Sequence, residues 1–201
     1  MKSFTNVSIA LAMTVGFASV AVAGDAKAPD AAKAPAKEAP KKMEMPKPAP
    51  EMVEMTKQWV GTWKCTGKAM MDPSKPTEMS DMKMTMKFAA DKAMGGFWIT
   101  GNMDSPMFKG MLHATYDATT KKFYSLMIDS WGGSQTMWSA GAKDNKMLWE
   151  GEARMPMPGM SAVKVRETHD MTDMKAGMKM KGEMTMDGKT WMTGWEATCK
   201  K

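Results

Sequence analysis

Apolar and polar side chains alternate with a period of two through most of the chain after residue 60. In one stretch Met82, Met84, Met86 and Phe88 fall on one side, while lysine and threonine fall on the other. Successive side chains of a β-strand point to opposite faces of its sheet, so this pattern predicts strands with one buried and one solvated face. The same alternation runs through residues 63–71, 108–116, 163–171 and 178–187.

Turn-forming residues separate these stretches, among them Gly95-Gly96, Gly132-Gly133 and Asp144-Asn145. One helix is predicted over 51–60 from the spacing of its apolar residues. About ten short strands joined by hairpins favour an all-β fold, a closed antiparallel meander β-barrel of about ten strands with a short N-terminal helix. Closure removes exposed sheet edges. A two-sheet sandwich is the alternative.

The N-terminal region differs from the strand-forming part. Lys2 precedes an apolar run that ends in Ala21-Val22-Ala23, which predicts a cleaved signal peptide over 1–23 and a periplasmic or secreted location. Residues 24–51 are rich in Ala, Pro and Lys, which predicts a disordered linker available as a tether to the envelope. Residues 52–201 then form the barrel domain, and no transmembrane segment is expected after cleavage.

The formal net charge is +6, but the predicted domain holds only two arginines, Arg154 and Arg166. Nucleic-acid grooves concentrate arginine beside exposed aromatic residues, so no nucleic-acid partner is expected. Motifs for nucleophilic, phosphate or zinc chemistry do not occur, which favours a non-enzymatic protein.

The two cysteines lie near opposite ends of the predicted domain. Cys65 shares a face with Trp63, and Cys199 shares a face with Trp191, Trp195 and Ala197. In an exported chain, two such cysteines predict a disulfide that joins the first strand to the last.

A resemblance to a known fold rests on Gly61-Thr62-Trp63, which enters the first strand from a short helix. This is similar to the Gly-x-Trp motif of the calycin barrels, namely lipocalins, fatty-acid-binding proteins and nitrobindin-like haem proteins. The run 116–124, followed by 128–130 and 164–167, resembles a widespread bacterial family of calycin-like domains of unknown function. The resemblance spans roughly residues 53–201 and implies one closed barrel with a central cavity and no assigned catalytic residues.

In calycins the tryptophan of this motif closes the barrel floor beneath a basic side chain from the C-terminal strands. Trp63 is the matching tryptophan, and Gly61 is the matching glycine. Arg166 is the candidate basic partner, although the alternation of its strand puts it on the outer face.

Glu167 and His169 are the candidate ligand-binding residues. Both fall on the apolar side of the stretch 163–171, about 7 Å apart along the strand. A buried charge needs a partner, and Glu167 beside His169 meets that need. The pair is either structural or the polar anchor of a ligand in the cavity.

Methionine, with 29 of 201 residues, allows a second interpretation. Methionine is an adaptable core filler, and this is the simpler explanation of the methionine-rich strands. Thioethers also select Cu(I), which makes copper(I) the one cofactor considered. The candidate ligands would be Met82, Met84, Met86, His169, Met178, Met180, Met184 and Met186.

The sequence therefore predicts an exported, non-enzymatic barrel that binds a small apolar or amphipathic ligand and carries no cofactor. The alternatives are a methionine-rich copper(I)-binding or oxidant-buffering periplasmic protein and, third, a structural envelope protein.

Overall fold

The computed structural model describes residues 46–72, 75, 77–156 and 162–201, within a compact unit that spans Glu44–Lys201. The predicted signal peptide over 1–23 and residues 24–45 of the predicted linker lie outside the described residues.

Helix α1 (Pro50–Trp59) begins with proline in its first turn, where the missing N–H costs no hydrogen bond. Its buried face consists of Met52, Met55 and Trp59, as the helical spacing predicts. In the described residues the helix is followed by eleven strands: β1 (Gly61–Met70), β2 (Met79–Ala90), β3 (Trp98–Asp104), β4 (Lys109–Asp117), β5 (Lys122–Asp129), β6 (Ser134–Ser139), β7 (Ala142–Lys143), β8 (Lys146–Arg154), β9 (Ala162–Asp170), β10 (Met178–Thr185) and β11 (Met192–Lys200).

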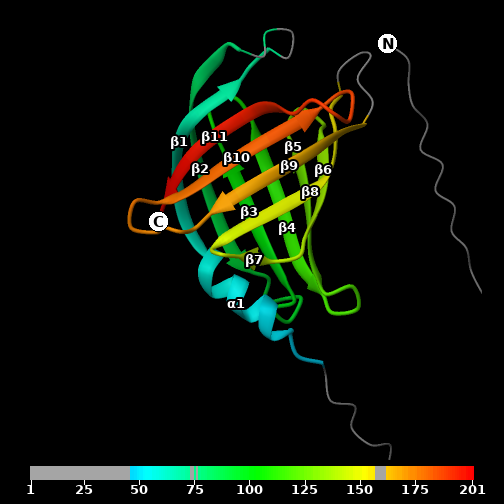
Figure 1. Cartoon of the computed structure of the whole chain (residues 1–201). Helices are drawn as coiled ribbons and strands as arrows, with labels where there is room; N and C mark the ends of the chain where they lie inside the picture. Colours follow the sequence, from blue (N-terminus) through cyan, green and yellow to red (C-terminus); the bar gives the residue numbers. More distant parts are fainter. Residues whose placement is uncertain (1–45, 73–74, 76, 157–161) are drawn as a thin grey trace, which may run out of the picture. The chain divides into compact units, whose positions relative to one another are not determined.

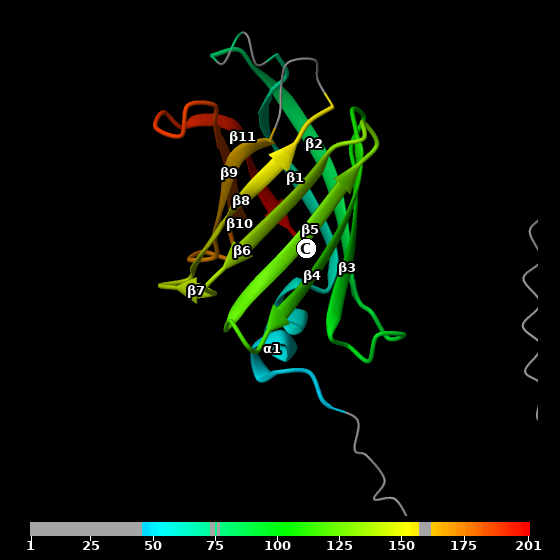
Figure 2. The same cartoon turned by 90° about the vertical axis from the view of Figure 1, so that its right-hand side faces the viewer.

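The strands form one antiparallel sheet in the order β6-β5-β4-β3-β2-β1-β11-β10-β9-β8-β7, and a further pairing of β6 with β8 closes it. Every described strand except the two-residue β7 belongs to the resulting ring of ten. Figures 1 and 2 show the ring from two directions, with α1 at one end. The predicted closed antiparallel barrel with one short helix is confirmed, and the sandwich alternative is wrong.

Helix α1 is joined to the barrel by apolar and polar contacts. The Trp59 ring lies 5.3 Å from the Phe88 ring of β2, between centroids. The Tyr116 hydroxyl of β4 donates to Glu51 Oε1 at 3.2 Å. The helix therefore supplies part of the barrel core at its own end.

The alternation places the predicted apolar faces inside the barrel on most strands. Trp63, Cys65, Met84 and Met86 are all buried. Two strands end earlier than predicted, so Met71, 36% exposed, and Met186, 54% exposed, lie beyond their strands and outside the core.

A β-bulge changes the alternation of β11. The pairing with β10 moves from Gly182↔Trp195 to Glu183↔Thr193, which leaves Gly194 as the extra residue. Residues before Gly194 therefore face the opposite way from the predicted alternation. Trp191, predicted to share the face of Cys199, instead packs against Arg166, whose guanidinium carbon lies 4.2 Å from the ring centroid.

Candidate functional site

A polar cluster lies among the core side chains of β6 and β9. The side-chain amide Nε2 of Gln135 donates to Glu167 Oε1 at 2.8 Å, and His169 Nε2 lies 3.4 Å from Glu167 Oε2. Glu167 and His169 thus lie side by side, as their spacing predicts. Gln135 holds the carboxylate from two strands away around the ring.

Two tryptophans flank His169. Ring centroids of Trp59 and His169 are 5.1 Å apart, and those of Trp149 and His169 are 6.3 Å apart. Trp149 on β8 stands directly opposite Glu167 on β9. His169 is therefore held between a helix residue and a neighbouring-strand residue, at the end of β9.

Two polar atoms of this cluster have no hydrogen-bond partner among the residues that the structure describes. They are Trp149 Nε1 and His169 Nδ1, and each residue is only 3% exposed. A buried donor or acceptor without a partner costs about 1–3 kcal/mol. Their common position inside one barrel is the most unusual polar feature of the described structure.

The tautomer of His169 follows from its neighbour. Glu167 offers only acceptor oxygens when ionised, so the nitrogen that faces it, Nε2, carries the proton. In the neutral ring Nδ1 is then an acceptor, while the indole N–H of Trp149 is a donor. With His169 in this neutral form, the cluster offers one free acceptor, His169 Nδ1, and one free donor, Trp149 Nε1.

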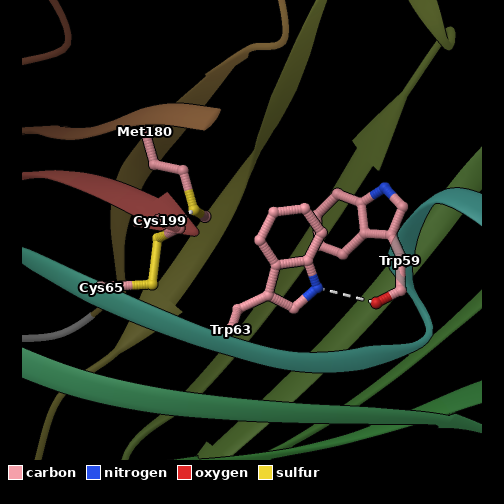
Figure 3. The surroundings of a disulfide bond; sticks show 5 residues. All are labelled: Trp59, Trp63, Cys65, Met180 and Cys199. Carbon is pink, nitrogen blue, oxygen red and sulfur yellow. Dashed lines mark hydrogen bonds between the residues drawn. A yellow bond between two sulfur atoms is a disulfide. The ribbon is translucent and has the colours of Figure 1, made fainter. Parts of the chain in front are cut away.

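The cysteines form the predicted disulfide between β1 and β11. Cys65 and Cys199 are directly opposite in register, with a Cα–Cα distance of 4.0 Å, and both are buried. Figure 3 shows that Met180 turns its sulfur toward this bond. The distance from Met180 Sδ to Cys199 Sγ is 3.4 Å. This is a sulfur–sulfur contact, because the bonded Cys199 has no thiol proton.

The predicted methionine ligands do not share one environment. Met84, Met86, Met178 and Met180 are buried in the core, and Met82 and Met184 pack against it. Met186, predicted with them on the apolar face, is exposed outside the barrel. Met147 on β8 and Met180 on β10 stand directly opposite His169 on the strand between them.

Gly61-Thr62-Trp63 lies where the helix meets β1. Gly61 has φ of +133°, a conformation that favours glycine. The indole Nε1 of Trp63 donates to the Trp59 carbonyl oxygen at 2.8 Å (Figure 3). This bond fixes the angle between the helix and the first strand.

The basic partner of Trp63 is Lys201, so the prediction of Arg166 is wrong. Lys201 Nζ lies 5.0 Å from the Trp63 ring centroid and donates to the Gln58 carbonyl oxygen at 2.7 Å. Arg166 lies on the outer face, where its Nε is 2.7 Å from Glu183 Oε2. That hydrogen bond lowers the pKa of Glu183 below its ordinary value.

Three residues that belong to the cluster or flank it were not predicted as site residues: Gln135, Trp149 and Trp59. Trp149 is obscured because Leu148, on the outer face beside it, hides the alternation of β8. Gln135 and Trp59 reach the cluster only through the closure of the ring and the docking of the helix. Met147, Trp149 and Ala153 still fall on one side of the strand, and this incomplete alternation is the signal that could have indicated Trp149.

Neither a carboxylate, histidine or cysteine metal cluster nor a membrane-spanning helix is found in the part of the chain that the structure describes. It contains no group of three or more His, Cys, Asp or Glu side chains placed to hold a metal ion. Within the same residues, no helix has both the length and the apolar character needed to cross a membrane.

The comparisons with known proteins agree with this fold. The crystal structure of Rv2717c from M. tuberculosis is similar, with a TM-score of 0.56 and 11% sequence identity, over 77% of this chain and 98% of that one. At that identity the similarity shows the fold alone. No curated protein matches the chain. Residues 48–201 match the family described as "Protein of unknown function (DUF1579)", and the chain belongs to that family.

Proposed function

We propose that the barrel binds a small amphipathic ligand whose polar end reaches the cluster of Gln135, Trp149, Glu167 and His169. The observation that carries the proposal is the pair of partnerless buried atoms, Trp149 Nε1 and His169 Nδ1. Ligand pockets are mostly apolar and hold a few polar groups that orient the ligand. A bound polar group would satisfy both atoms.

The chemistry of the cluster favours a particular ligand class. One free acceptor beside one free donor matches a hydroxyl group or a protonated carboxyl group, because each of these both donates and accepts. The surrounding Trp59, Met147 and Met180 side chains suit an apolar remainder. A medium-chain alcohol has both parts and is the simplest probe.

Export and a calycin-type barrel belong to the same proposal. The charged and apolar N-terminal pattern supports export, and the Ala, Pro and Lys content of 24–51 supports a tether. The Gly61-Thr62-Trp63 turn beneath Lys201 supports the calycin relation.

Octan-1-ol and octane test the proposal, because octane lacks the polar end. Octan-1-ol should bind and raise the melting temperature, since a ligand of the native state stabilises it. His169→Phe and Trp149→Phe remove one free polar atom each and should weaken octan-1-ol binding about tenfold, which is the value of one hydrogen bond. Trp138→Phe, on the exposed outer face of β6, is the matched control and should leave binding unchanged.

The proposal fails if octan-1-ol and octane bind equally or if neither binds. It also fails if His169→Phe and Trp149→Phe bind octan-1-ol as tightly as the control Trp138→Phe. Native mass spectrometry of protein taken from its own envelope would reveal a carried lipid or metal directly.

Copper(I) binding is the second candidate, and one observation favours it. Met147, His169 and Met180 are consecutive neighbours across three strands, and His169 Nδ1 has no partner. Thioether and imidazole are suitable Cu(I) ligands. Met180 would have to turn its sulfur from the disulfide toward His169, which the flexible thioether permits.

A Cu(I) competition titration distinguishes Cu(I) binding by these methionines from a role in core packing alone. Met147→Leu and Met180→Leu conserve volume but remove the sulfur, so a true site should lose affinity at least tenfold. Met137→Leu, buried on β6, is the matched control. Equally weak affinity in all variants would leave these methionines as core filler.

A further inference from the structure

Lysine side chains concentrate on the outer face of four neighbouring strands, β10, β11, β1 and β2. Figure 1 shows these strands side by side. All the lysines concerned are exposed. We call this surface the lysine face: it comprises Lys64, Lys83, Lys87, Lys179 and Lys200.

The register places these lysines close together. Lys64 on β1 stands directly opposite Lys200 on β11. On the other side Lys64 stands opposite Thr85 of β2, so Lys83 and Lys87 are its two diagonal neighbours. Diagonal neighbours on one face are about 7–8 Å apart, and like charges directly opposite each other are destabilising. The fold therefore maintains a local repulsion.

This repulsion is not relieved by acidic partners. Among the described residues, no carboxylate lies within 4.0 Å of any ammonium of the lysine face, whereas five other lysines form such pairs. Threonines occupy the positions between them: Thr66 opposite Lys83, and Thr198 opposite Lys179.

The acidic residues at the border of the face are already engaged. Asp104 stands opposite Thr85 but pairs with Lys109 at 3.5 Å. Asp170 stands opposite Lys179 but pairs with Lys146 at 3.1 Å. Both carboxylates thus have their charge balanced by lysines outside the face.

The next row of the same four strands is different. There Lys181, Glu196, Lys68 and Asp81 follow one another across the sheet with alternating charge. On these four strands the unbalanced charge is therefore confined to the lysine face.

A shallow open depression of about 470 Å³ lies at the border of the lysine face. Its polar lining consists of Lys64, Thr66, Lys83 and Thr85 together with Asp104 and Ser105, and the carboxylate of Asp104 is paired with Lys109. Ammonium and hydroxyl groups there can donate hydrogen bonds to an oxyanion such as a phosphate.

We propose that the lysine face docks on a bilayer surface of anionic phospholipids, with headgroup phosphates against Lys64, Lys83 and Lys200. Clustered lysines near such a surface each contribute to binding through its negative potential. The face carries neither arginine nor an aromatic side chain, the groups that read nucleic acids, so a lipid surface suits it better.

Vesicle co-sedimentation tests the proposal with the full chain. The vesicles are phosphatidylcholine alone or phosphatidylcholine with 30% phosphatidylglycerol. A Lys64→Gln/Lys83→Gln/Lys200→Gln variant should bind the anionic vesicles about 100-fold more weakly, from three lysine contributions. All proteins share the same N-terminal segment, so differences between them report the barrel surface.

A matched control removes the same charge elsewhere. Lys57, Lys75 and Lys181 each pair with a glutamate outside the lysine face. The Lys57→Gln/Lys75→Gln/Lys181→Gln variant should bind within about fivefold of the unchanged chain, because screened and paired charges contribute little.

Three results would overturn the proposal. The first is an equal loss of binding in both triple variants, which would make net charge the cause. The second is equal binding to vesicles with and without phosphatidylglycerol. The third is binding of soluble polyphosphate without binding of anionic vesicles, which would assign the face to a polyanion instead.

Discussion

The disulfide of Cys65 and Cys199 should account for a large part of the stability of the barrel. The perturbation is the double variant Cys65→Ala/Cys199→Ala, which removes the bond and leaves both strands with small apolar side chains. The two residues are 134 positions apart, so the bond closes nearly the whole barrel into one loop.

The magnitude follows from the length of that loop. In the chain-entropy model, a loop of this length lowers the entropy of the unfolded chain by an amount worth about 5 kcal/mol at 25 °C. Domains are stable by roughly 5–15 kcal/mol in total. The variant should therefore retain the fold at 25 °C only with a small margin, and it should melt far below the bonded protein.

Urea unfolding measures this difference directly. The free energy of unfolding should fall by about 4–5 kcal/mol, and the slope against urea should increase because the unfolded chain is no longer cross-linked. The reduced and alkylated native chain is the companion measurement, since it also lacks the bond. A loss below about 1 kcal/mol with an unchanged slope would refute the loop-closure reasoning.

Other substitutions test local features of the barrel. Gly67→Ala should destabilise the fold by about 2–3 kcal/mol, because the added Cβ would overlap the backbone carbonyl oxygen of Glu196; a loss below 0.5 kcal/mol in urea unfolding would contradict this. The pKa of Asp170 is lowered from 3.8 to about 2, first by its hydrogen bond with Thr172. Its contribution to stability is therefore present above about pH 4 and is lost as the pH falls toward 2, so Asp170→Asn should flatten the acid limb of the stability curve. Lys201→Met removes the cation above the tryptophan at the start of β1 and should cost about 0.5–1 kcal/mol; unchanged stability would make that contact incidental.

The fold could be predicted because the alternation of side chains is local information. Val163, Val165 and His169 are buried on β9 as their spacing predicts, and the positive φ of Asp144 and Asn145 fits the predicted two-residue turn. A chain made of sequential hairpins repeats this local information strand after strand.

The errors come from features that the alternation does not contain. The bulge at Gly194 reverses the facing of Trp191, and a bulge depends on the pairing with another strand. Lys201, and not the predicted Arg166, contacts the Trp63 ring because β11 brings it beside the end of the helix, where it also bonds the Gln58 carbonyl oxygen.

The candidate site was predicted in part for the same reason. Glu167 and His169 are two residues apart on one strand, so their contact is local. Trp149 and Gln135 join them only through the pairing of β8 with β9 and the closure of β6 on β8. The partnerless atoms could be identified only once these strands were placed in register.

The order of the strands has a consequence for how the barrel folds. Almost every pair of hydrogen-bonded strands consists of strands that follow one another in the chain. The two exceptions are β6 with β8, which are separated only by the two-residue β7, and β1 with β11, the first and last strands. Hairpins can therefore form a curled sheet in sequence, but the ring closes only when the last strand pairs with the first. Until Met192–Lys200 is in place, β1 and β10 both present open edges, which are sites for pairing with other chains. A chain without β11 would form an open sheet with two unpaired edge strands, and we expect it to aggregate in addition to being less stable.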